Sequence, residues 1–145
     1  MSRMSVADFF ARYRATDAAL QTYVEGLPVW VNVWRGWMFL IFTAAVVFVV
    51  SKREARWLAL TMVISLFAYN IVTMISGVGR FPSIAFVLLW SPLAFYVWRR
   101  RAHLRMAGWF DHVYSWWLTT ALATLCVSLA FDVYNVAYSL IAGVP

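Results

Sequence analysis

Apolar residues fall along this chain in four long runs, separated by short polar and basic segments. Four stretches carry no charged side chain, namely residues 36–51, 57–79, 81–98 and 113–131. A helix needs roughly 20 mainly apolar residues to cross about 30 Å of hydrocarbon, whereas an isolated open strand would leave backbone groups unpaired in lipid. The first run becomes long enough when the uncharged segment before Arg35 is added. The pattern therefore predicts transmembrane helices at residues 28–51, 57–77, 82–98 and 110–141.

The first 25 residues have a different pattern, in which apolar and charged positions recur at mostly helical intervals. Ser5 followed by Asp8 resembles a capping box, and Gly26 and Pro28 mark a break before the first span. The pattern predicts an amphipathic helix at residues 5–25, lying either on the membrane surface or on a partner protein. Its mixed charge is not that of a cleaved signal peptide. The expected fold is thus an all-α integral membrane protein, a single domain over residues 1–145 with an interfacial helix before a four-helix bundle.

Composition agrees with this fold class and excludes several others. Of 145 residues, 64% are hydrophobic and 12% are charged, against roughly 25% charged residues in an average soluble domain. A water-soluble fold of this length could not bury so much apolar surface. A single cysteine, Cys126, excludes an intrachain disulfide scaffold.

Lysine and arginine predict the orientation of the bundle. The loops after the first and third spans hold seven of them, whereas the other side holds four and Arg35 lies within a span. The positive-inside rule then places both termini outside the cell. The arginine bias over lysine favours a bacterial source and hence a bacterial inner membrane. The net charge is +6. We interpret this positive charge as serving to bind anionic lipid headgroups rather than nucleic acid, and the residues expected to make these contacts are Arg99, Arg100, Arg101 and Arg105.

Two of the predicted spans carry a stripe of small polar residues on one helix face. The fourth span has Thr120, Thr124, Ser128, Asp132, Asn135 and Ser139, and the second has Thr61, Ser65, Tyr69, Thr73 and Ser76, with Asn70 beside them. Because lipid offers such groups no hydrogen bonds, we expect both stripes to face the interior and each other. They form either packing seams between helices or the lining of a solvated or ligand-binding cleft.

Arg35 and Asp132 are the ionisable residues that interrupt apolar sequence, and an ion at the bilayer centre costs at least about 2.5–3.5 kcal/mol. Asn32, Asn70 and Asn135 fall at a similar predicted depth. The sharpest hypothesis is an Arg35–Asp132 ion pair whose remaining donors and acceptors are bonded by Asn70 and Asn135. The alternative is that each of the two charged side chains extends separately to the lipid headgroups at the membrane surface.

The sequence predicts no catalytic residue, metal site or cofactor. His103 and His112 would lie on opposite faces of one helix, Cys126 lies within an apolar span, and no phosphate-binding or dinucleotide-binding loop is present. Trp90 and Trp117 lie deeper than the other tryptophans and are interpreted as packing residues.

The leading functional hypothesis is a non-catalytic accessory or structural subunit of a larger inner-membrane complex, with other membrane-protein subunits or a second copy as partners. One alternative is a small oligomeric transporter or channel that uses a polar cleft between the second and fourth spans. The other is a binder of a hydrophobic ligand such as a quinone, carotenoid or lipid, beside Trp90 or Trp117.

Overall fold

The computed structural model describes residues 5–104 and 107–143, and all regular structure in this part of the chain is helical. The elements in chain order are α1 (Val6–Glu25), α2 (Val29–Thr43), α3 (Ala45–Phe48), α4 (Arg53–Ser76), the 3-10 turn η1 (Phe81–Ser83), α5 (Ile84–Arg101) and α6 (Trp109–Ala142). Four helical segments are long and apolar enough to cross a membrane: Val29–Phe48, Arg53–Ser76, Phe81–Arg101 and Trp109–Ala142.

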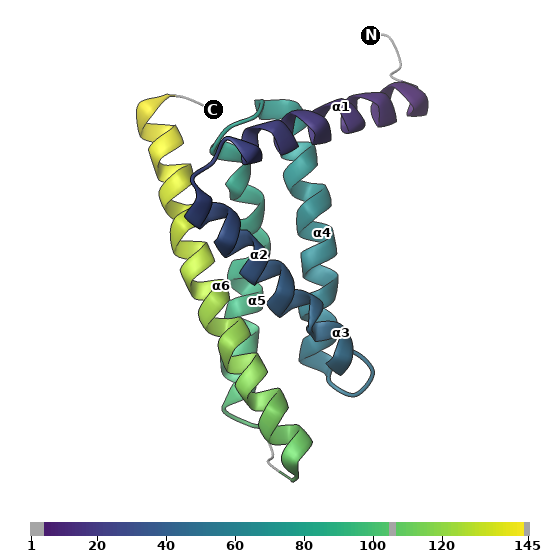
Figure 1. Cartoon of the computed structure of the whole chain (residues 1–145), viewed down its shortest axis with the longest axis vertical. Helices are drawn as coiled ribbons and strands as arrows, with labels where there is room; N and C mark the ends of the chain where they lie inside the picture. The colour runs from purple at the N-terminus through teal and green to yellow at the C-terminus, as the bar shows by residue number, and fades with distance from the viewer. Residues whose placement is uncertain (1–4, 105–106, 144–145) are drawn as a thin grey trace.

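These four segments form a bundle in which α5 packs against both α4 and α6 (Figure 1). The hydrophobic core lies where α3, α4, α5 and α6 come together, and its most deeply buried members are Ala45, Ala55, Leu58, Val97, Tyr114, Leu118, Ala121 and Leu125. The outer faces are apolar as well, since Val50, Ile75 and Ile141 are each more than four-fifths exposed. Exposed apolar faces on all sides are typical of helices whose solvent is lipid.

The helices differ from the predicted spans mainly at their ends. α4 begins at Arg53 and α5 ends at Arg101, so both continue through basic residues that the charge pattern assigned to loops. The first span is divided at Ala44, between α2 and α3. α5, by contrast, is continuous through Pro92.

α1 lies across one end of the bundle, at the same end as the last turn of α6 (Figure 1). The capping box at its start is confirmed, because the Ser5 hydroxyl accepts the Asp8 N–H at 3.1 Å and the Asp8 carboxylate accepts the Ser5 N–H at 3.1 Å. α1 is attached to α4 by a ring contact between Tyr13 and Phe67, whose centroids are 6.1 Å apart. This end of the bundle is called the α1 end below, and the opposite one the loop end.

Candidate functional site

The polar residues of four segments meet near Tyr69 at the α1 end. Tyr69 lies on α4, and its hydroxyl is within electrostatic range of Tyr23 on α1, Arg35 on α2 and Asp132 on α6. The Ser83 side chain of η1 also lies near Asp132. Polar residues that are far apart in the sequence are therefore neighbours in this part of the bundle.

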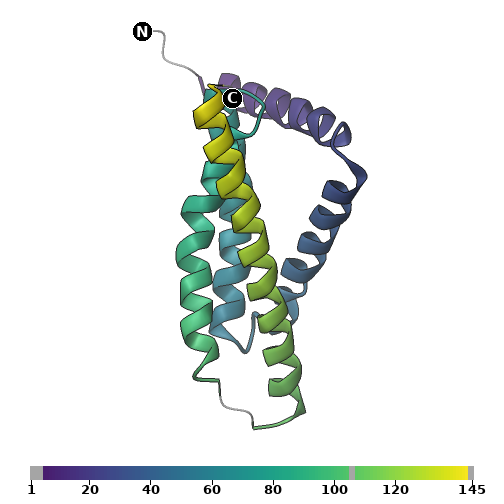
Figure 2. The same cartoon turned by 90° about the vertical axis from the view of Figure 1, so that its left-hand side faces the viewer.

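The hypothesis of an Arg35–Asp132 ion pair is wrong. Among residues 5–104 and 107–143, the ion pairs are Lys52–Asp111 and Arg100–Glu54, both at the loop end. The physical reason is the path of α2, which leans away from α6 toward the α1 end (Figure 2) and buries only Ile41 and Phe42. Arg35 itself is exposed, whereas its neighbours Trp34 and Trp37 are the residues that bond to α6.

The asparagines expected around that ion pair also have other surroundings. Asn70 is buried, and its amide nitrogen donates to the Asp17 carboxylate of α1 at 3.3 Å. Its carbonyl oxygen and the buried Ser139 hydroxyl have no hydrogen-bond partner in the described part of the chain. The Asn32 amide donates to the Leu27 carbonyl at 3.5 Å, and Asn135 is half-buried on α6. Asn70 thus tethers α1 to α4, and the predicted network around Arg35 does not form.

Three hydroxyls of the two stripes accept hydrogen bonds from tryptophans of other helices. On α4, the Ser65 hydroxyl accepts the Trp90 indole N–H of α5 at 2.7 Å. On α6, Thr124 accepts from Trp37 at 3.2 Å and Ser128 accepts from Trp34 at 3.3 Å, both tryptophans being on α2. An indole N–H surrounded by hydrocarbon needs an acceptor. The hydroxyls of the stripes supply acceptors to the tryptophans of the neighbouring helices. At these three positions the stripes bond to other helices and not to each other, whereas Tyr69 and Asp132, one from each stripe, lie within electrostatic range.

Other members of the stripes bond within their own helices. The Ser65 and Thr73 hydroxyls donate to the carbonyls of Thr61 and Tyr69, and the Thr120 hydroxyl donates to that of Trp116. Such bonds to the residue four positions earlier satisfy the hydroxyl donor where no water is available.

Trp90 and Trp117, the two deep tryptophans, are both buried and both bonded inside the bundle. The Trp117 indole donates to the Ile41 carbonyl at 2.9 Å, and the Trp90 ring packs on Phe42 and Phe86 with centroids 5.4 Å and 5.0 Å away. Their surroundings are those of packing residues.

The loop end holds a polar network that the sequence reasoning missed. Glu54 is 6% exposed and accepts from the Arg100 Nε of α5 and from the Tyr114 hydroxyl of α6, each at 3.1 Å. Beside it, the Lys52 ammonium lies 2.5 Å from the Asp111 carboxylate and 5.0 Å from the Tyr114 ring centroid. One signal was available, because Glu54 is the lone acid among the basic residues that precede the second apolar run.

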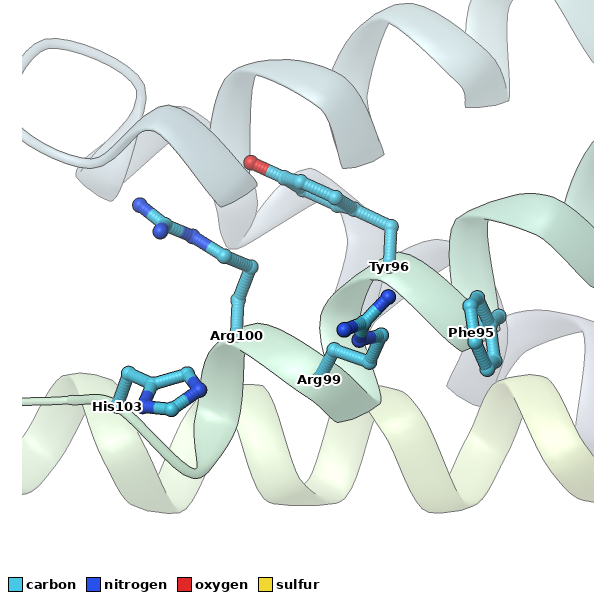
Figure 3. A pocket seen from close by; sticks show the side chains of 5 residues that line it. All are labelled: Phe95, Tyr96, Arg99, Arg100 and His103. Atoms are coloured by element: carbon cyan, nitrogen blue, oxygen red, sulfur yellow. The ribbon is translucent and has the colours of Figure 1, made fainter.

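Two surface hollows lie at this loop end. One, of about 350 Å³, is lined by Phe95, Tyr96, Arg99, Arg100 and His103 (Figure 3). The other, of about 390 Å³, is lined by Ser51, Arg53, Arg56, Trp57 and Leu60. Of the arginines predicted to contact headgroups, Arg99 and Arg100 line the first hollow and Arg101 is exposed outside it, whereas Arg105 lies outside the described residues.

In the part of the chain that the structure describes, no group of three or more His, Cys, Asp or Glu side chains could hold a metal ion. Comparison of the chain with protein-family models, with curated proteins and with solved structures finds no match.

Proposed function

We propose that this chain is a non-catalytic accessory subunit of a larger membrane complex, and that it docks a transmembrane helix of another subunit beside α2. The observation that carries the proposal is Arg35, which is exposed on a helix of membrane-spanning length and forms no ion pair with any described residue. A cation at membrane depth is costly when unpaired, so a partner that supplies a carboxylate would be stabilised there.

The shape of the α1 end supports the same proposal. α1 crosses this end of the bundle between α4 and the start of α2 (Figures 1 and 2), and these three helices are called the frame. The first half of α2 leaves Val29, Val33 and Trp30 more than half exposed. The partner segment that fits this chemistry is an apolar helix with one aspartate or glutamate at the depth of Arg35.

The proposed setting is a bacterial inner membrane with both termini on the outer side. The support is the placement of the basic residues, since Lys52, Arg53, Arg56 and Arg99–Arg101 all belong to segments that meet at the loop end. The two alternative functions have less support, because the hydroxyl stripes accept bonds from tryptophans of neighbouring helices and both deep tryptophans are bonded inside the bundle.

Site-specific photo-crosslinking in native membranes tests this function. A photoreactive residue at Val33, on the exposed half of α2, is compared with one at Val47, which is exposed on α3. Each is combined with native Arg35, R35Q or the charge-preserving R35K, and R101Q is the matched control because Arg101 is an exposed arginine away from the frame.

We expect Val33 to crosslink to one membrane protein of a different sequence, with the adduct in a transmembrane segment that contains an acidic residue. R35Q should lower the yield about tenfold, as expected for loss of an ion pair with a partly buried carboxylate, while R35K and R101Q retain it. Crosslinks only to lipid, crosslinks to a second copy of this chain, or a yield unchanged by R35Q would each overturn the proposal.

A further inference from the structure

The hollow at the end of α5 combines positive charge with an aromatic wall. Arg99, Arg100 and His103 contribute nitrogen donors, and Phe95 and Tyr96 contribute aromatic rings (Figure 3). The Arg99 guanidinium lies over the Phe95 ring, 5.6 Å from its centroid. Guanidinium groups gathered in this way recognise phosphate through charge and paired donors.

Arg100 is already positioned for such a role. Its Nε donates to Glu54 at 3.1 Å, and its side chain is nevertheless 50% exposed. The bond to Glu54 occupies Nε, and Arg100 lines the hollow. A donor that is fixed before the ligand arrives loses little conformational freedom on binding.

An apolar track leads away from the hollow along the same face of α5. Leu88, Phe95 and Arg99 are separated by seven and four residues, which places them on one side of the helix, and Leu88 and Phe95 are 68% and 56% exposed. Eleven residues of helix between Leu88 and Arg99 span about 16 Å at 1.5 Å per residue. This length matches one leaflet of a hydrocarbon core that is about 30 Å thick.

We propose that this hollow is a binding site for an anionic phospholipid. The phosphate lies between Arg99, Arg100 and His103, and an acyl chain follows Phe95 toward Leu88. The track distinguishes a lipid from free phosphate, which would use the hollow alone. Arg101, although part of the same basic cluster, does not line the hollow and serves as the internal control.

Native mass spectrometry of the full chain in mild detergent tests the site. The chain is titrated with phosphatidylglycerol and with phosphatidylcholine of the same acyl length. The variants are R99Q/H103Q for the phosphate contacts, F95A for the track and R101Q as the control, with circular dichroism to verify folding. R99K is added as a variant that preserves the charge. A parallel titration adds inorganic phosphate as competitor.

Phosphatidylglycerol should bind in preference to phosphatidylcholine, and R99Q/H103Q should weaken it at least about fivefold, the effect of roughly one cation near an anionic lipid. F95A should weaken both lipids, and R101Q should change the affinity less than about twofold. R99K should keep the preference for phosphatidylglycerol but bind it less tightly than the native chain, because lysine lacks the paired donors of guanidinium. Equal binding of the two lipids, or an equal effect of R101Q and R99Q/H103Q, would overturn the site. Displacement by inorganic phosphate together with indifference to F95A would show that free phosphate is the ligand. The site is independent of the α2 docking surface, which R35Q tests separately.

Discussion

Glu54 is the one charged side chain that is buried among the described residues, and its two bonds join three helices. Through Arg100 and Tyr114 it connects the start of α4 to the end of α5 and to the first turns of α6. A buried carboxylate is tolerated only where such donors satisfy it. The neighbouring pair of Lys52 and Asp111 extends this network toward α3.

Removing Glu54 should therefore destabilise the loop end. E54A leaves the Tyr114 hydroxyl buried without its acceptor and costs about 2 kcal/mol in the free energy of unfolding, because Arg100 is half-exposed and regains water. Y114F removes one bond and costs about 1 kcal/mol. Thermal unfolding in detergent micelles provides the comparison, with R101Q as the control. A Y114F variant less stable than E54A would contradict this account.

The capping box makes the first turn of α1 sensitive to pH. Bonds from the hydroxyl and backbone N–H of Ser5 lower the pKa of the Asp8 carboxyl below its ordinary value near 3.8. Because the pKa is lower in the folded state, the stabilisation is present above the ordinary pKa and is lost as the pH falls through the lowered one.

We thus expect amide exchange in the first turn of α1 to accelerate below about pH 3.8, beyond the intrinsic change of exchange with pH. Exchange measured by NMR on the full chain reports this directly. D8N should remove the transition and show fast exchange throughout. A transition of the same size in D8N would assign it to another carboxyl group.

At the scale of elements, the sequence predicts the helices well and their neighbours poorly. The length of an apolar run is a local property, so all four spans were predicted from it. The hydrogen-bond partner of Ser65 depends on which helix packs beside α4. The spacing of the small residues in a stripe does not reveal that helix, because the spacing is the same whether a stripe meets Trp90 of α5 or Trp34 of α2. The Arg35–Asp132 pairing failed for the same reason, because depth in the membrane does not specify proximity across it.

The tryptophan bonds are expected to determine how far α2 stands from α6. A W34F/W37F variant keeps most of the ring surface but loses both indole donors, at about 0.6 kcal/mol each. Spin labels at Val33 and Val127, which are exposed on α2 and α6, should show a broader and longer distance distribution by pulsed electron resonance. W98F, which changes an exposed tryptophan on α5, is the control. An unchanged distribution would show that apolar contacts alone position α2.

For the whole molecule, the two ends of the bundle differ in charge and packing, and this asymmetry predicts the orientation. In a variant with Cys126 replaced by alanine, a cysteine at Gly26 should react with a membrane-impermeant thiol reagent added to intact cells. A cysteine at Ala102, next to Arg99–Arg101 at the other end, should react only after lysis. The reverse pattern would place the termini in the cytoplasm.

The tryptophans of α2 and the hydroxyls of α6 that accept their hydrogen bonds are far apart in the sequence, and this separation has a consequence for biosynthesis. Trp34 and Ser128 are 94 positions apart, and Trp37 and Thr124 are 87 apart. At about 5–20 residues per second, a ribosome needs roughly 5–20 s to synthesise the acceptors after the donors have been made. During that interval the indoles of Trp34 and Trp37 lack their acceptors on α6. A partner of the kind proposed above, if already present, would therefore reach α2 before α6 does.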